Sequence, residues 1–388
     1  MILKQIAGVL LRKYLPVFLC CLIGLCSCSD SNTPEVENFT EDISVSIKLR
    51  AYPRESARAV DESGTALESA IDLENLKILI FDENETLYDV LYDNGKMPSG
   101  TNLTCTFTGE YQLTTSLSPS RYNASSEFAI VVLANWETGS DNRFETDLKG
   151  HPIDTTEIGT LTISDLKVMD FMLKPMNHDE DTYSWVPGEG SLIPMFGSRY
   201  TSLRGYDHSN FNESNPMPVP EIKLVRAVTK IEIENLDTDA GREITGIELV
   251  HRNRKGWLMQ DYSFQGWTDN VTSLTSRGNE QFTTLPLRFN QTGNVYTAYI
   301  QEMKFNDVNS RQAIRVEMNL NGVIFHKWIY LAPYGADSRP ILSDYYDSDW
   351  NAIKRNYIYR YLITSLGFEF IISVEPWKFG GKVHIDLE

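Results

Sequence analysis

The segment "ISVSIKLR", residues 43–50, alternates apolar and polar side chains from end to end. Its apolar residues Ile43, Val45, Ile47 and Leu49 fall on one face, while serine, lysine and arginine fall on the other. Successive side chains of a strand point to opposite faces, so a period of two predicts a half-buried β-strand. Similar patterns follow along the chain, which makes this strand the first of a β-rich fold.

Apolar runs of strand length, separated by turn residues, continue far downstream. "FAIVVLAN" (128–135) is almost continuously apolar and predicts a strand buried on both faces. Asn321-Gly322 separates two apolar runs within 313–331, which is a hairpin signal. Further strands are expected within 76–93, 222–236, 244–252, 295–303 and 356–364. The pattern as a whole predicts an all-β protein.

Three prolines, Pro216, Pro218 and Pro220, stand in the polar stretch that ends in "NPMPVPEIK". Proline lacks the N–H that a central ladder needs, so alternating prolines favour an extended linker. The chain has 388 residues, a length that suggests two domains. We therefore expect a boundary near residue 218, between an N-terminal domain at 43–218 and a C-terminal domain at 219–388.

The chain finishes with two more amphipathic segments, "FEFIISVE" (368–375) and "KVHIDLE" (382–388), which predict strands. The apolar residues that share a face are Phe368, Phe370, Ile372 and Val374 in the first, and Val383, Ile385 and Leu387 in the second.

The first 27 residues have the form of a secretory signal, with Lys4, Arg12 and Lys13 before an apolar run. That run is shorter than the roughly 20 residues of a membrane-spanning helix. It ends in "LCSC", which resembles a bacterial lipobox and implies acylation of Cys28 and anchoring in the outer membrane. An ordinary cleaved signal is the alternative. The acidic stretch that follows, grouped with Cys28 as residues 28–42, is a solvated tether or a surface-export signal.

The net charge of −18 disfavours nucleic acid as a partner. The sequence has no G-x-S-x-G, H-E-x-x-H, Walker or G-x-G-x-x-G motif, and its six histidines lack metal-ligand spacing. We therefore expect no catalytic residues, no metal site, no cofactor and no enzymatic activity. Cys105 is expected to be a small core residue.

Several of these segments, in order, resemble FimA/Mfa-type fimbrillins, which are the lipoprotein precursors of type V pili. They are "LKILIFDENETLYDV", "FAIVVLANW", "SLIPMFGS", "VRAVTKIEIEN", "RNYIYRYLIT" and "ISVEPW". The resemblance implies two tandem transthyretin-like (Greek-key) β-sandwich domains and a place in a surface fimbria that supports adhesion.

The resemblance also implies assembly by strand exchange. A trypsin-like protease would cut after Arg58, Arg50 or Arg54, ranked in that order, and the first strand, 43–50, would be lost. A strand of another fimbrial subunit would then take its place, and the segments 368–375 and 382–388 have the alternation that a donor needs. They could equally close their own domain, and the three arginines could simply be solvated.

Other roles stay open at this stage. An anchor would keep its lipid and first strand, and a tip adhesin would carry an altered C-terminus or a pocket for a host glycan or protein receptor. A glycan-binding surface lipoprotein is a further possibility, with Trp185, Trp257, Trp267 and Trp350 stacking on sugars. Burial of these tryptophans at the ends of sheets is the commoner explanation.

Overall fold

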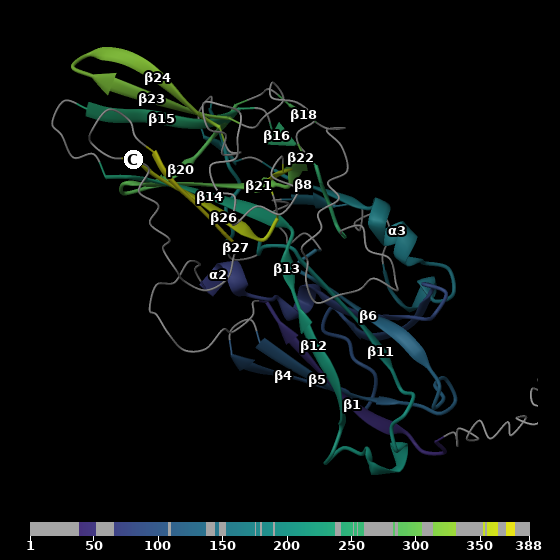
Figure 1. Cartoon of the computed structure of the whole chain (residues 1–388). Coiled ribbons are helices and arrows are strands. Elements are labelled where there is room, and N and C mark those ends of the chain that lie inside the picture. The colour runs from purple at the N-terminus through teal and green to yellow at the C-terminus, as the bar shows by residue number, and fades with distance from the viewer. Residues whose placement is uncertain are drawn as a thin grey trace, which may run out of the picture.

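The computed structural model folds as an all-β protein with a few short helices (Figure 1). It describes residues 39–51, 66–107, 110–136, 144–146, 153–174, 176–178, 181–188, 191–236, 242–250, 252–253, 255–259, 282–283, 286–304, 313–330, 352–353, 355–363 and 370–376. The predicted site residues that lie outside these ranges are Cys28, Arg54, Arg58, Phe368, Val383, Ile385 and Leu387.

Two sheets build the first half of the molecule. The four-stranded sheet has the order β12-β1-β5-β4, with β1 at Ile43–Arg50, β4 at Asn102–Phe107, β5 at Glu110–Leu117 and β12 at Met217–Lys223. The five-stranded sheet has the order β13-β11-β6-β2-β3, with β2 at Leu76–Phe81, β3 at Leu87–Asp93, β6 at Glu127–Ala134, β11 at Met195–Ser202 and β13 at Val225–Arg226. Both sheets contribute to one hydrophobic core, which includes Val45 and Leu113 from the first and Ile80 and Val131 from the second.

Two further sheets build the second half around a separate core. One has the order β20-β21-β14-β26-β27, with β14 at Val228–Asn235, β20 at Asn290–Thr292, β21 at Val295–Gln301, β26 at Tyr357–Ile363 and β27 at Phe370–Pro376. The other has the order β24-β23-β15-β19-β10-β9, with β9 at Met176–His178, β10 at Asp181–Tyr183, β15 at Arg242–Val250, β19 at Leu287–Arg288, β23 at Ala313–Leu320 and β24 at Val323–Tyr330.

Short segments cross between the two halves. The hairpin of β9 and β10 precedes residue 218 in the chain but joins the six-stranded sheet of the second half, where Tyr183 pairs with Arg288. Conversely β17 (Gly256–Trp257) pairs with β8 (Asp170–Leu173), which in turn pairs with β7 (Phe144–Thr146). The minor elements are β16 (Arg252–Asn253) with β18 (Phe282–Thr283), β22 (Met303–Lys304) with β25 (Ala352–Ile353), and the helices α2 (Ala66–Ser69) and α3 (Ile163–Val168).

The linker interpretation of the prolines is wrong. Pro218 and Pro220 lie in β12, which pairs in parallel with β1 and places Pro218 opposite Ser46. β12 ends its sheet, and an edge strand is where a proline without an N–H can be accommodated. The core prediction for Cys105 is also wrong, because its side chain is exposed on β4 at the opposite edge of that sheet.

Candidate functional site

The first strand is clasped on both sides. β1 runs antiparallel to β5 over its whole length, from Ile43 opposite Leu117 to Arg50 opposite Glu110. On its other side β1 runs parallel to β12. The four strands lie side by side in Figure 1, with β1 between β12 and β5. Loss of β1 would therefore leave two unpaired strand edges facing one another.

The apolar face of β1 belongs to the first core. Ile43, Val45, Ile47 and Leu49 are 2%, 1%, 0% and 1% exposed. Burial of each such side chain contributes about 1.5–3 kcal/mol, so the four together contribute roughly 6–12 kcal/mol as an upper estimate. Removal of β1 would expose the apolar surface that these four side chains cover.

The opposite face of β1 is less solvated than the period-two pattern predicts. Ser44 and Ser46 are buried as well, and Gln112 Nε2 donates a hydrogen bond to Ser46 Oγ at 2.8 Å. Lys48 is exposed and Arg50 is half-buried. The prediction of a half-buried strand is therefore wrong for the first half of β1, where both faces are covered and only small side chains occupy the second face.

The end of β1 at Arg50 is fixed to its neighbours. The guanidinium lies 3.1 Å from Glu110 and 3.2 Å from Glu221, so both flanking strands supply a carboxylate. The Arg50 carbonyl accepts a hydrogen bond of 2.7 Å from the Leu224 amide, and Ala51 is completely buried. The Arg50–Ala51 peptide bond thus lacks the exposure of a loop tip, where proteolytic nicking concentrates. This geometry argues against Arg50 as the processing residue of the folded chain.

After Ala51, the described residues resume with α2, and a buried polar cluster holds this helix in place. Glu68 is 0% exposed; its carboxylate lies 2.9 Å from Lys230 Nζ on β14 and accepts a hydrogen bond from the Tyr299 hydroxyl on β21. Arg226 Nε donates to the Glu68 carbonyl at 2.8 Å, and its terminal nitrogen donates to Ser69 Oγ at 2.9 Å. Burial and the Glu68 charge raise the pKa of Tyr299 well above its usual value. We call Glu68, Arg226, Lys230 and Tyr299 the Glu68 cluster.

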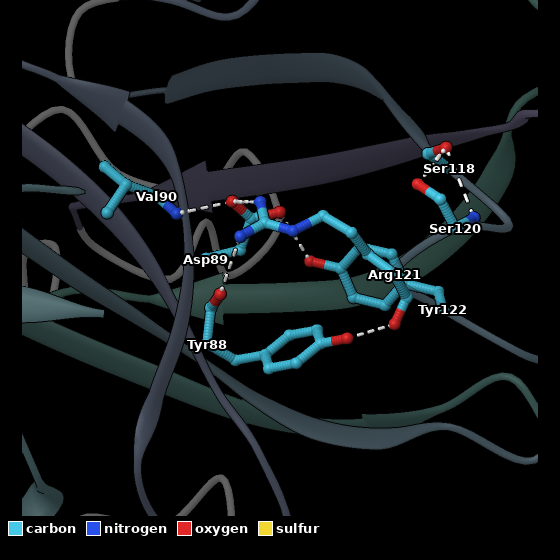
Figure 2. Close-up of polar contacts among 7 residues, drawn as sticks. All are labelled: Tyr88, Asp89, Val90, Ser118, Ser120, Arg121 and Tyr122. Carbon is cyan, nitrogen blue, oxygen red and sulfur yellow. Dashed lines mark hydrogen bonds and ion pairs between the residues drawn. The ribbon is translucent and has the colours of Figure 1, made fainter. Parts of the chain in front are cut away.

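A second polar group secures β5 from the other end of the sheet, and Figure 2 shows it in close-up. Arg121, in the turn after β5, donates to the Asp89 carboxylate and to the Tyr88 carbonyl of β3. Tyr122 donates to the second oxygen of Asp89 at 2.8 Å, and the Tyr88 hydroxyl donates back to the Arg121 carbonyl. Because β3 belongs to the other sheet, these contacts tie β5 to the sandwich independently of β1. We call these residues the Asp89 cluster.

The predicted C-terminal strand forms, at a different kind of position. β27 pairs antiparallel with β26, from Ile363 opposite Phe370 to Tyr357 opposite Pro376, and it contains Ile372 and Val374. Among the described strands it ends its sheet and has one paired neighbour.

The four tryptophans with a possible sugar-stacking role occupy varied positions. Trp185 is 1% exposed, its indole N–H donates to Ser191 Oγ at 3.0 Å, and its ring packs edge-on against Tyr299. A sugar-stacking role for Trp185 is therefore wrong. Trp257 is half-buried on β17, whereas Trp267 and Trp350 lie outside the described residues.

The described residues lack two further classes of site. They contain no group of three or more histidine, cysteine, aspartate or glutamate side chains placed to hold a metal ion. They also include no helix with the length and apolar content needed to span a membrane.

The Glu68 cluster is a feature that the sequence pattern did not predict. A signal was present in "VRAVTKIEIEN", where Arg226 and Lys230 lie among the apolar residues of a predicted strand. Charged groups are rarely buried without a partner, so these two cations predict acidic neighbours, and Glu232 of the same segment is one of them, 3.2 Å from Lys230. Nothing in the sequence indicated that Glu68, 158 residues before Arg226, would be another.

Comparison of the sequence with protein-family models and with curated proteins gives no match. Solved structures do match. The tip fimbrial protein Mfa3 from Porphyromonas gingivalis, with a C-terminal truncation, aligns with a TM-score of 0.50 and 15% identity over 86% of this chain and 100% of that one. A fimbrial assembly protein from Parabacteroides distasonis aligns at 0.45 and 13% identity over 85% and 95% of the two chains. The fimbrial anchor protein Mfa2 from P. gingivalis aligns at 0.34 and 10% identity over 86% and 98%.

Of these three, the Mfa3 match alone reaches a TM-score of 0.50, so the likeness of fold rests on it. The chain has the fold of an Mfa-type fimbrial protein, which confirms the resemblance that the ordered sequence segments indicated.

Proposed function

We propose that this chain is a fimbrial subunit with two transthyretin-like β-sandwich domains, anchored to the outer membrane through acylated Cys28 and displayed at the cell surface. Proteolysis releases β1, and a strand from a neighbouring subunit takes its seat between β5 and β12. The observation that carries the proposal is β1 itself, the first of the described strands, which is paired on both sides and buries four apolar side chains.

Cutting matters because a tethered strand competes at the high effective concentration of an intramolecular group. While the chain is intact, β1 contributes its burial of roughly 6–12 kcal/mol without a cost of association. Once severed, β1 must pay that cost each time it rebinds, and a donor strand attached to a neighbouring subunit gains the advantage. Main-chain hydrogen bonds to β5 and β12 would add to the affinity of the donor.

We place the cut after Arg58 or Arg54. The geometry around Arg50 supports this choice, because its carbonyl is hydrogen-bonded and the next residue is buried. A cut after either of the other arginines lies between β1 and α2. The Glu68 cluster would then keep the new N-terminal segment attached to β14 and β21 while β1 leaves.

The candidate donors are the segments 368–375 and 382–388. β27, which covers most of the first, has one paired neighbour among the described strands, so its release breaks a single ladder. The sequence 382–388 lies outside the described residues, and its role as a donor is part of the proposal. The partners are further fimbrial subunits, of this or a related chain.

The test is limited digestion with trypsin, followed by mass spectrometry and electrophoresis in SDS. We expect wild-type chain to lose β1 through a cut after Arg58 or Arg54 and then to form SDS-resistant ladders. Arg54→Gln/Arg58→Gln together should block both events, whereas Arg50→Gln should leave both unchanged. Val383→Asp should permit the cut but prevent the ladders. A cut chain that stays monomeric at every concentration would overturn strand exchange.

An anchor or tip adhesin that does not polymerise is the second candidate. The observation that favours it is the firm hold on the Arg50 end of β1, which suits a chain that keeps its first strand. The fold of a tip fimbrial protein is compatible with it. Resistance of the folded chain to trypsin at Arg54 and Arg58, together with binding of the intact chain to a polymerising subunit, would assign this role.

A further inference from the structure

The strand β24 is an exposed edge. It ends the six-stranded sheet, and no strand in the described part of the chain pairs with its outer side. The β23–β24 hairpin lies at one end of the molecule in Figure 1. Asn321 and Gly322 connect the two strands with φ of 52° and 86°, which is the backbone of a tight type I′ turn.

Apolar side chains on both faces of β24 meet solvent. Val323, Ile324, Phe325 and Trp328 are 56%, 60%, 47% and 47% exposed. Odd-numbered residues share a face with the buried Met318 of β23, which pairs with Phe325, and even-numbered residues occupy the opposite face. Soluble proteins usually protect a long edge with charge, proline or a covering segment. β24 contains no proline and no acidic residue, and its only basic side chains are His326 and Lys327.

We propose that a second copy of this chain pairs with this edge, β24 against β24, antiparallel about a two-fold axis and centred on His326. The two-fold axis requires the same patch on both subunits. Identical antiparallel strands must then place residues of the same face opposite one another, so the sum of two paired residue numbers is even. In the register centred on His326, Ile324 faces Trp328 of the partner subunit, and Phe325 faces Lys327 of the partner subunit.

This register satisfies the side chains better than the two nearest alternatives. It pairs an aliphatic with an aromatic residue twice, and it places a lysine against an aromatic ring twice. A register centred on Lys327 would set two lysines directly opposite, which is destabilising. A register centred on Phe325 would set Trp328 against the glycine of the turn and leave Lys327 facing Val323. The strand is therefore complementary to itself in one register.

The pairing is expected to be weak between free chains. Four partly exposed side chains and one strand edge offer less than the roughly 800 Å² per partner that a stable complex buries. Subunits that share a membrane or a fibre meet at high local concentration, and there a weak contact becomes effective. The contact needs neither proteolysis nor β1, so it stands or falls separately from strand exchange.

The register can be tested by disulfide trapping in the uncleaved full chain with its native cysteines replaced by serine. Two His326→Cys chains would place their Cα atoms about 5.5 Å apart, which is within the disulfide range. Two Ile324→Cys chains would place theirs about 14 Å apart, because the two residues are four positions out of register. We expect oxidation to trap at least about ten times more dimer with His326→Cys. Equal trapping by both variants, or trapping by neither, would overturn the proposal.

The strength of the contact can be tested by sedimentation equilibrium of the uncleaved chain. Trp328→Lys should raise the dimer dissociation constant by at least about tenfold. Val168→Lys changes an apolar residue on α3 that is more exposed than Trp328, 61% against 47%, and should leave the constant unchanged. Thermal melts of both variants would verify folding, which exposed positions should not disturb. A wild-type chain that stays monomeric at the highest concentration it can reach in solution, or equal effects of the two changes, would also overturn the proposal.

Discussion

The strands β1 and β27 stand near opposite ends of the chain and have the same alternation of apolar residues, yet the fold treats them differently. β1 has a paired neighbour on each side, whereas β27 has one among the described strands. A strand held by two ladders can leave only if both break. A strand held by one ladder can leave when that ladder alone breaks.

The difference teaches that a period of two identifies a strand without fixing its place in a sheet. In the proposed assembly the more firmly held strand is the one that a protease must sever, and the less firmly held strand is the one that the subunit can lend. Four changes would break or sharpen this comparison.

The largest effect is expected inside β1. Ile47→Asp places an unpaired carboxylate in the first core, where Ile47 is 0% exposed, and should lower the free energy of unfolding by about 4 kcal/mol or more. Lys48→Asp changes the neighbouring exposed position and should alter it by less than about 0.5 kcal/mol. Urea denaturation measures both. A small effect of Ile47→Asp would mean that β1 is dispensable for the intact fold.

The second effect concerns the segment behind β1. Glu68→Gln removes the fully buried partner of Lys230, which then keeps only the half-buried Glu232 at 3.2 Å, and should lower the free energy of unfolding by about 3 kcal/mol. Arg360 lies on β26, the strand beside β27, and forms a less buried pair with Glu232. Arg360→Gln should lower the free energy of unfolding by at most about 1 kcal/mol. Equal losses would show that the two ends are held alike. Adding Lys230→Met to Glu68→Gln should restore part of the loss.

A third, smaller effect is expected in the Asp89 cluster. Tyr122→Phe removes the hydroxyl that donates to Asp89 and should lower the free energy of unfolding by about 1 kcal/mol. Tyr206→Phe is the control, because this tyrosine is 45% exposed and should tolerate the change. If the cluster secures β5 without help from β1, the Tyr122→Phe loss should persist after trypsin has removed the first strand. A loss that disappears on cleavage would contradict that independence.

The smallest effect is a titration. Tyr111 lies on β5, opposite Leu49 of β1, and burial raises its pKa to about 12. The fold therefore favours the neutral phenol, and this contribution is complete below about pH 10 and is lost as the pH rises through about 12. The difference in ultraviolet absorbance between wild type and Tyr111→Phe reports this group. Release of β1 should lower the pKa of Tyr111 toward 10, the usual value for tyrosine. An unchanged pKa would mean that β1 stays in place.

The strands themselves could be predicted from the sequence. β2, β3, β6, the β23–β24 hairpin and β26 lie where period, apolar runs and Asn321-Gly322 placed them. These signals are local, and they survive folding because neighbouring residues alone produce them.

What could not be predicted is the relation between distant segments. The prolines of β12 correctly indicated that this segment cannot join a central ladder. An edge strand meets that condition as well as a linker does, so the sequence did not distinguish the two. The burial of Ser44 and Ser46 depends on what covers β1, and the partner of Lys230 lies on α2. Of the candidate site, the sequence supplied the first strand and its apolar face; its two neighbours and the hold on Arg50 came only from the fold.

The uneven fastening of β1 gives its departure a direction. At Arg50 two carboxylates and the Leu224 amide grip the strand, whereas the residues just before Ile43 are exposed. The pairs of β1 with its two neighbouring strands should therefore separate first at Ile43 and last at Arg50. Tension from the proposed lipid anchor at Cys28 would act on that exposed end and separate the residue pairs one at a time, which takes less force than shearing them all together. An incoming strand that follows step by step would enter beside Leu117 and finish beside Glu110.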